Sequence, residues 1–143
     1  MKLHQISIFL ENQPGRLTKP CDALAEAGIN ILTLSLADTQ NFGILRIIVE
    51  DWEKASKVLE KAGMVLKITE VVAIKVPDSP GGLSKILHVV EKAGINIEYM
   101  YAFTTKRGGD SILILRFDNV EESIRILKKA GIGIIDSIFL FEN

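Results

Sequence analysis

Two loops carry the side chains best suited to binding a small charged molecule. They read Glu11-Asn12-Gln13-Pro14-Gly15-Arg16-Leu17 and Pro77-Asp78-Ser79-Pro80-Gly81-Gly82-Leu83. Each loop places an amide or a carboxylate, Asn12 or Asp78, two residues before a proline. The glycine after that proline lets a ligand approach the backbone, and the N-terminus of the helix expected next carries unpaired N–H groups and a partial positive charge.

These loops are complementary to an α-amino acid. The helix N-terminus would hold the carboxylate, and Asn12 or Asp78 would accept a hydrogen bond from the ammonium. The plainer alternative is that both residues form Asx-turns and that Ser79 is the N-cap. Asn30 and Asn96 follow Gly-Ile after the helix, each just before an isoleucine, and present further amides where the chain re-enters a sheet. Their alternative role is to satisfy local backbone groups.

Catalytic signals are weak by comparison. His4 and His88 have no metal-ligand spacing, and Cys21 lies within a predicted helix with no histidine near it in sequence. The chain contains neither familiar glycine-rich phosphate loop and no H-E-x-x-H motif. We therefore expect no catalytic residue, no metal and no cofactor.

Composition excludes several classes of protein. The 143 residues suit one average domain or two very small ones, and 48% apolar with 24% charged residues suits a globular core. A net charge of −1 argues against nucleic-acid binding through a basic surplus. One cysteine cannot form an internal disulfide. Without an apolar run of about 18 residues or a signal-peptide pattern, we expect a cytoplasmic protein that binds no membrane.

The chain consists of two copies of an internal repeat. Pro14–Ile31 and Pro80–Ile97 are identical at nine of 18 positions, at an offset of 66 residues, and both close on Ala-Gly-Ile-Asn-Ile. Leu45–Ile47 matches Leu115–Phe117 at an offset of 70, which predicts a second hairpin four residues longer than the first.

Both copies give the same order of elements. Strands are predicted at Leu3–Leu10, Leu32–Asp38, Gly43–Glu50 and Met64–Thr69, then at Val71–Val76, Glu98–Thr105, Ser111–Phe117 and Gly133–Phe141, with a hairpin turn at Lys106–Asp110. Helices are predicted to start at Pro14 and Pro80 and to end at Ala-Gly, and also to span Asp51–Ala62 and Asp118–Ala130.

The fold class expected is therefore α+β. Residues 1–70 and 71–143 each form a ferredoxin-like βαββαβ domain, an antiparallel sheet with both helices on one face. Alternation predicts the helix-facing set Leu34, Leu36, Leu45, Ile47, Val49, Met100, Leu113, Leu115 and Phe117. The opposite face is also apolar, with Ile44, Ile48, Tyr99, Tyr101, Phe103, Ile112 and Ile114 beside Arg46 and Arg116. We expect a second chain to cover that face in a homodimer.

The chain resembles a tandem ACT-domain protein over its whole length. The two loops, the AGINI turns and the βαββαβ frame carry this resemblance. ACT domains are regulatory modules that bind small molecules, most often amino acids, at domain interfaces. The resemblance implies that Asn12 and Asp78 occupy the ligand-contacting loop position, that Asn30–Ile31 and Asn96–Ile97 occupy the post-helix position, and that Gly15 and Gly81 leave room for ligand.

The copies depart from one another at three points. Asp78 stands where the first copy has Asn12, and Gly82 where it has Arg16, so the two sites cannot be equivalent. Pro20 is predicted two turns into the first helix, where it would remove a hydrogen bond and introduce a kink.

The function expected is a stand-alone regulatory protein that senses an amino acid at domain or subunit interfaces and modulates a metabolic enzyme partner. One alternative is a dimerisation scaffold without ligand. Another is an acylphosphatase-like enzyme, which would need a phosphate-binding arginine such as Arg16 in the first loop. A third is an RNA-recognition module, for which the first copy lacks strand aromatics.

Overall fold

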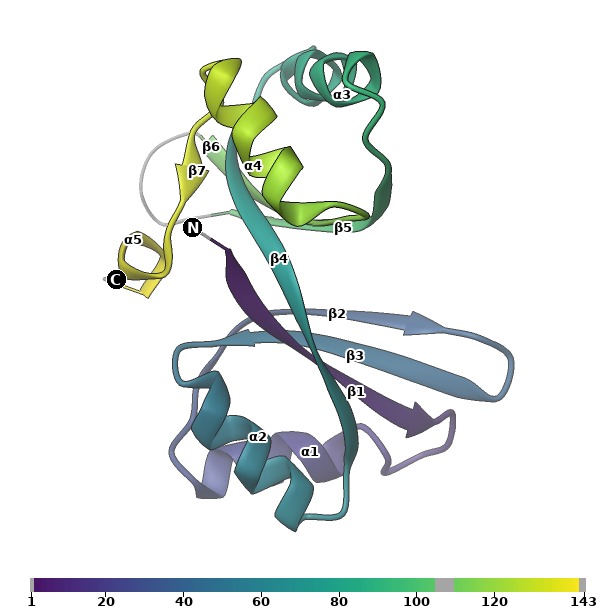
Figure 1. Cartoon of the computed structure of the whole chain (residues 1–143). Coiled ribbons are helices and arrows are strands. Elements are labelled where there is room, and N and C mark those ends of the chain that lie inside the picture. The colour runs from purple at the N-terminus through teal and green to yellow at the C-terminus, as the bar shows by residue number, and fades with distance from the viewer. Residues whose placement is uncertain (1, 105–109, 142–143) are drawn as a thin grey trace. The chain divides into compact units, whose positions relative to one another are not determined.

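The computed structural model describes residues 2–104 and 110–141, which form two compact units. The first is His4–Thr69, and the second runs from Glu70 onward and includes the N-terminal residues up to Leu3. Elements of the first unit are β1 (Leu3–Glu11), α1 (Thr18–Glu26), β2 (Ile31–Asp38), β3 (Phe42–Val49), α2 (Trp52–Lys61) and the start of β4 (Val65–Pro77). Those of the second are the rest of β4, then α3 (Gly82–Lys92), β5 (Ile97–Thr104), β6 (Asp110–Phe117), α4 (Val120–Lys129), β7 (Ile134–Ile135) and α5 (Ser137–Phe141) (Figure 1).

Each unit is built on an antiparallel sheet with two helices on one face (Figure 1). In the first, β3 lies between β2 and β1. In the second, β6 lies between β5 and β4, and β7 pairs with the other edge of β4. This is the predicted α+β, ferredoxin-like fold in two copies. The strands predicted at 64–69 and 71–76 form one continuous 13-residue strand, β4.

The cores lie between helices and sheets. Leu24, Leu45 and Leu59 are at most 1% exposed in the first unit, as are Leu115, Phe117 and Leu127 in the second. Leu34, Leu36 and Met100 were predicted to face the helices, but they are 53%, 52% and 41% exposed. They lie on β2 and β5, the end strands in the strand order, where a helix pair centred on the sheet does not cover them.

All four main helices end in the same way, as their Ala-Gly sequences predict. The N–H of the residue after each glycine bonds a carbonyl five residues earlier, as in Ile29 N to Leu24 O at 2.9 Å and Ile95 N to Val90 O at 3.2 Å. The glycines themselves, at positions 28, 63, 94 and 131, adopt φ between +71° and +84°. This is the Schellman cap, which glycine forms without a Cβ penalty.

Helix starts differ from the sequence prediction. Pro14 and Pro80 lie in turns before the helices and not at their first position, since α1 begins at Thr18 and α3 at Gly82. Pro20 is therefore the third residue of α1, inside the first turn and not two turns into the helix. Lys19 N bonds Gly15 O at 3.4 Å, so the missing N–H of Pro20 interrupts this series at the Arg16 carbonyl, directly before the regular helix. By contrast, Asp51 and Asn119 cap α2 and α4 by accepting from Lys54 N and Glu122 N, each at 3.1 Å.

Strand register corrects the alignment of the two copies. Ile8 pairs with Leu45, and Ile74, its equivalent at the offset of 66, pairs with Leu113. Residues of β3 and β6 therefore correspond at an offset of 68, not 70, and Arg46 and Arg116 are not equivalent. The hairpin is two residues longer in the second copy. Its turn was predicted at Lys106–Asp110; residues 106–109 lie outside the described residues, and Asp110 is the first residue of β6.

The C-terminal prediction was also wrong. A strand was expected at Gly133–Phe141, but β7 stops at Ile135 and α5 follows. Asp136 explains the change, because its carboxylate accepts a hydrogen bond from Phe139 N at 2.9 Å and its carbonyl accepts from Leu140 N at 3.1 Å. A side chain that caps a helix competes with strand pairing.

Candidate functional site

The loop between β4 and α3 depends on two glycines. Gly81 has φ +86° and precedes the helix directly, and no side chain caps the helix there. A Cβ on Gly82 would lie 2.3 Å from the Pro77 carbonyl oxygen, so only glycine fits this close approach. Gly82 N bonds Ser79 O at 3.0 Å, which closes the turn. Ser79 is therefore not the N-cap of α3, which leaves the first N–H groups of the helix without a side-chain acceptor.

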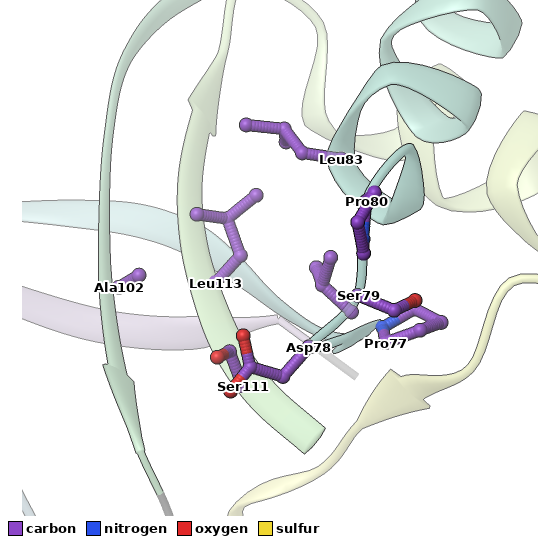
Figure 2. A pocket seen from close by; sticks show the side chains of 9 residues that line it. Pro77, Asp78, Ser79, Pro80, Leu83, Ala102, Ser111 and Leu113 are labelled. Atoms are coloured by element: carbon purple, nitrogen blue, oxygen red, sulfur yellow. The ribbon is translucent and has the colours of Figure 1, made fainter. Parts of the chain in front are cut away.

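A cavity of about 400 Å³ opens beside this loop, inside the second unit (Figure 2). The lining contains four of the predicted site residues, together with side chains from three strands: Val76, Pro77, Asp78, Ser79, Pro80, Leu83, Ala102, Ser111 and Leu113. Figure 2 shows the Asp78 side chain extending toward the strand that carries Ser111, while Leu83 and Leu113 form the wall at the other end. The cavity thus has a polar end and an apolar end.

The polar end of the cavity carries a negative charge. Asp78 is the one charged residue of the nine that line the cavity, and Ser79 and Ser111 supply hydroxyl groups. A carboxylate accepts hydrogen bonds and favours a cation, whereas the N-terminus of α3 favours an anion within its first turn. Together with the apolar wall, this arrangement suits a small molecule that carries an ammonium, a carboxylate and an apolar group.

The first loop is arranged differently. Its predicted site residues, from Asn12 to Leu17, are exposed, as Asp78–Gly81 and Leu83 are in the second loop. Arg16 Nη2 lies 3.4 Å from Glu11 Oε2, an exposed ion pair. Asn12 N bonds Asn41 O at 3.0 Å, which ties the loop to the turn between β2 and β3. Gly15 adopts φ +85°, as Gly81 does, and it lines a second cavity.

That cavity, of about 520 Å³, lies along α1. Its lining is mostly polar or small: Gly15, Thr18, Lys19, Asp22, Ala23, Glu26 and Ala62. Its charged residues are one base, Lys19, and two acids, Asp22 and Glu26, and no apolar side chain in its lining matches Leu83 and Leu113. The two copies therefore present different surfaces beside equivalent loops.

The residues that follow the first helix of each unit, Asn30–Ile31 and Asn96–Ile97, lie away from the loop of the same unit. Asn96 is exposed and exchanges hydrogen bonds with Asp118: its N–H donates to Asp118 Oδ1 and its carbonyl accepts from Asp118 N, both at 3.2 Å. Ile97 pairs with Phe117, whereas the cavity residue Ala102 pairs with Leu113, about 17 Å further along β5 at the usual rise of a strand.

Asn30 and Ile31 have the matching position in the first unit. Asn30 is exposed, and Ile31 pairs with Val49, at the other end of β3 from the loop that carries Asn12. No single unit brings the loop and the post-helix residues of its copy together.

Sequence reasoning missed five lining residues: Val76, Pro77, Ala102, Ser111 and Leu113. Ser111 and Leu113 lie on β6, and Ala102 lies on β5 opposite Leu113. The alternation of side chains along β5 could have indicated Ala102, because it lies two residues after Met100 and therefore on the face that was predicted to meet the helices. Placing these residues against the loop required the register of three strands.

The two histidines and the cysteine, considered above as candidate catalytic residues, lie in three different environments. The His4 ring stacks on Trp52 with centroids 4.5 Å apart, and His88 is exposed 4.0 Å from Glu91 Oε2. Cys21 is a half-buried thiol. Across residues 2–104 and 110–141, no three His, Cys, Asp or Glu side chains are grouped as metal ligands. None of the helices described there is long and apolar enough to cross a membrane.

Ion pairs that shift pKa values lie at the surface of the second unit. The Lys2 ammonium, 2.6 Å from Glu121 Oε1, lowers the pKa of that carboxyl by hydrogen bonding, and the pKa of Lys2 is raised in return. Hydrogen bonds from Arg125 likewise lower the pKa of Glu122. None of these residues lines a described cavity.

Comparison with known proteins gives a consistent result. A family model of the ACT domain pair matches residues 1–140. The crystal structure of protein BT0572 from Bacteroides thetaiotaomicron is 38% identical with a TM-score of 0.93, and the match covers 100% of this chain and 98% of that one. The ligand-free regulatory subunit of aspartate kinase from Thermus thermophilus shares the fold, with 21% identity, a TM-score of 0.60 and coverage of 89% and 91%.

A curated relative matches over a shorter span. The acetolactate synthase small subunit of Buchnera aphidicola subsp. Baizongia pistaciae (strain Bp) is 32% identical over 77 residues. This match covers 50% of the present chain and 48% of that subunit, so about half the length of the relative is spanned.

Proposed function

The chain belongs to the family of ACT domain pairs, and on that premise we propose that it is a regulatory protein that binds an α-amino acid and thereby modulates a cytoplasmic metabolic enzyme. It performs no catalysis itself. The observation that carries this proposal is the cavity at the β4–α3 loop, with Asp78 at one end and Leu83 and Leu113 at the other.

Three groups of this site match three groups of the ligand. The Asp78 carboxylate accepts hydrogen bonds from the ammonium, which a charged acceptor strengthens. The uncapped start of α3 donates N–H groups to the carboxylate. Leu83, Leu113 and Val76 contact the apolar side chain. Binding modulates a partner because the ligand favours one of two states, and equal affinity for both would shift nothing.

Relatives support a regulatory role. The aspartate kinase and acetolactate synthase proteins named above are a regulatory subunit and a small subunit, respectively. By analogy, the partner proposed here is an enzyme of amino-acid metabolism.

A homodimer completes the site in this proposal. Leu83 is 36% exposed and Ala102 is exposed on β5, although both line the cavity. A second chain docked along that side would bury these apolar groups and close the wall. Light scattering with and without ligand measures whether the dimer forms and whether ligand stabilises it.

Direct binding tests the function. The purified chain is screened against the twenty α-amino acids by thermal shift, since a ligand held only by the folded state adds about 2.7 kcal/mol at a hundredfold excess over its Kd. For the best ligand, Asp78→Asn is expected to weaken binding about 10- to 100-fold, as loss of a hydrogen bond to a charged group costs about 1.5–3 kcal/mol.

Asn12→Ala is the matched control, because it alters the equivalent position in the first copy. It should leave the Kd unchanged. If none of the twenty amino acids binds at millimolar concentration while the dimer stays intact, the chain is a dimerisation scaffold instead. Arg16, which an acylphosphatase-like enzyme would use for phosphate, is engaged by Glu11, and this favours the binding function over that alternative.

A further inference from the structure

The position that matches the cavity in the first copy is built from other side chains. At the offsets fixed by strand register, Ser111 corresponds to Gly43 and Leu113 to Leu45. On the end strands, Ala102, opposite Leu113, corresponds to Leu36, opposite Leu45. The exchange of Ala102 for Leu36 adds three carbon atoms at the rim of one site.

Leu36 extends over the backbone where the second copy is open. Its Cδ1 lies 3.6 Å from the place where a Cβ on Gly43 would stand, which is van der Waals contact. Gly43 itself is buried. In the second copy the alanine ends at Cβ, and both Ala102 and Ser111 line the open cavity. Leu36 therefore fills space that the second copy keeps free.

We propose that residue 102 sets the size of the binding cavity and that leucine at the matching position closes the first copy, so that each chain holds one ligand. The ligand part of this inference rests on the proposed function. The difference in open space between the copies does not depend on any ligand.

The occupant expected is an α-amino acid whose apolar side chain extends toward Ala102. A larger residue at 102 would exclude large side chains before small ones. Ala102→Leu is compatible with the fold, because leucine already occupies the matching place on β2 and is 52% exposed there.

A thiol-reactivity experiment measures the open space without a ligand. In a Cys21→Ser background, Ser111→Cys and Gly43→Cys are modified with N-ethylmaleimide, and the rates are followed by mass spectrometry. The Gly43→Cys side chain meets only ordinary contacts at its Cβ, so this variant is expected to fold. We expect the cysteine at 111 to react at least tenfold faster than the one at 43.

Two further variants make the test reciprocal. Ala102→Leu should slow modification at 111, and Leu36→Ala should accelerate modification at 43. Equal rates at 111 and 43, or rates that ignore these substitutions, would overturn the proposed difference in space.

Calorimetry then tests the ligand part with glycine, alanine, valine, leucine and phenylalanine. One binding event per chain is expected, and Ala102→Leu should lose the largest bound side chains while keeping the smaller ones. Two events per chain, or an unchanged size preference in Ala102→Leu, would refute the role of residue 102. Absence of binding by the unaltered chain would refute the proposed function, and the thiol rates would still decide the difference between the copies.

Discussion

The two loops that precede α1 and α3 share a Pro-Gly pair and diverge at the next residue. Gly15 and Gly81 have almost the same conformation, with φ of +85° and +86°. The same turn closes before both helices, because Arg16 N bonds Gln13 O at 3.3 Å as Gly82 N bonds Ser79 O at 3.0 Å. Gly82 lies against the Pro77 carbonyl, where a Cβ would be 2.3 Å away, whereas Arg16 carries a Cβ at the equivalent position. The regular part of α1 begins two residues later in relative terms than α3, because Pro20 has no N–H to donate to the Arg16 carbonyl.

The comparison shows how a few substitutions change a site without changing the fold. Both units keep the same sheet order and the same helix C-caps. The second loop borders a cavity with one carboxylate, whereas the first carries an Arg16–Glu11 ion pair. The function proposed for the second copy thus depends on the side chains of the loop and on the residues opposite it.

The largest effect on stability is expected from Gly82→Ala. The added Cβ would collide with backbone, which cannot move aside as a flexible side chain does, and we expect a loss of about 3 kcal/mol in the free energy of unfolding. Arg16→Ala, at the equivalent position, should change that free energy by no more than about 0.5 kcal/mol. Urea denaturation of the two variants measures both values, and equal losses would contradict the difference in room for a Cβ at the two positions.

An intermediate and equal effect is expected at the shared glycine. Gly15→Ala and Gly81→Ala each force an alanine into the left-handed region, although neither Cβ meets an atom within 4 Å. Each should cost about 1–2 kcal/mol. Denaturation curves of this pair sharpen the comparison, because a large inequality would mean that the loops already differ at the first glycine and not at the residue after it.

The sequence predicted the repeated fold because its signals were local. Ala-Gly at the end of each helix specified the cap, and Asp51 and Asp118 marked helix starts within two residues. It failed where tertiary contacts decide. Asp136 stops the last strand by capping a short helix, and Leu34 and Leu36 are exposed because β2 is an end strand.

Prediction of the candidate site had the same limit. Asp78, Ser79, Pro80 and Leu83 were identified from the loop and do line a cavity. Ala102, Ser111 and Leu113 were not, since they meet that loop only through pairing of β4, β6 and β5. An alignment in error by two residues on β6 also hid the correspondence of Ser111 with Gly43. The binding role of all these residues stays a prediction that the experiments above test.

The smallest expected effect is on the pH dependence of the free energy of unfolding, and it concerns an ion pair of the second unit. Hydrogen bonding to Lys2 lowers the pKa of Glu121 in the folded state below its usual 4.5, so this ion pair stabilises the fold above that pH and the contribution is lost as pH falls through the lowered pKa. The raised pKa of Lys2 places the other limit above 10.5, where the same stabilisation disappears as pH rises.

Substitution at matched positions isolates that contribution. Glu121→Gln should lower the Tm slightly at neutral pH and flatten the decline of the Tm on acidification between about pH 5 and pH 3. Glu53→Gln is the control, because Glu53 is the equivalent residue of α2 and the ion pair of Lys2 is with Glu121 of α4. Because both groups of the Lys2–Glu121 pair are exposed, added salt should shrink the difference between Glu121→Gln and the unaltered chain. An identical pH profile for Glu121→Gln and Glu53→Gln would show that the ion pair gives the second unit no acid sensitivity of its own.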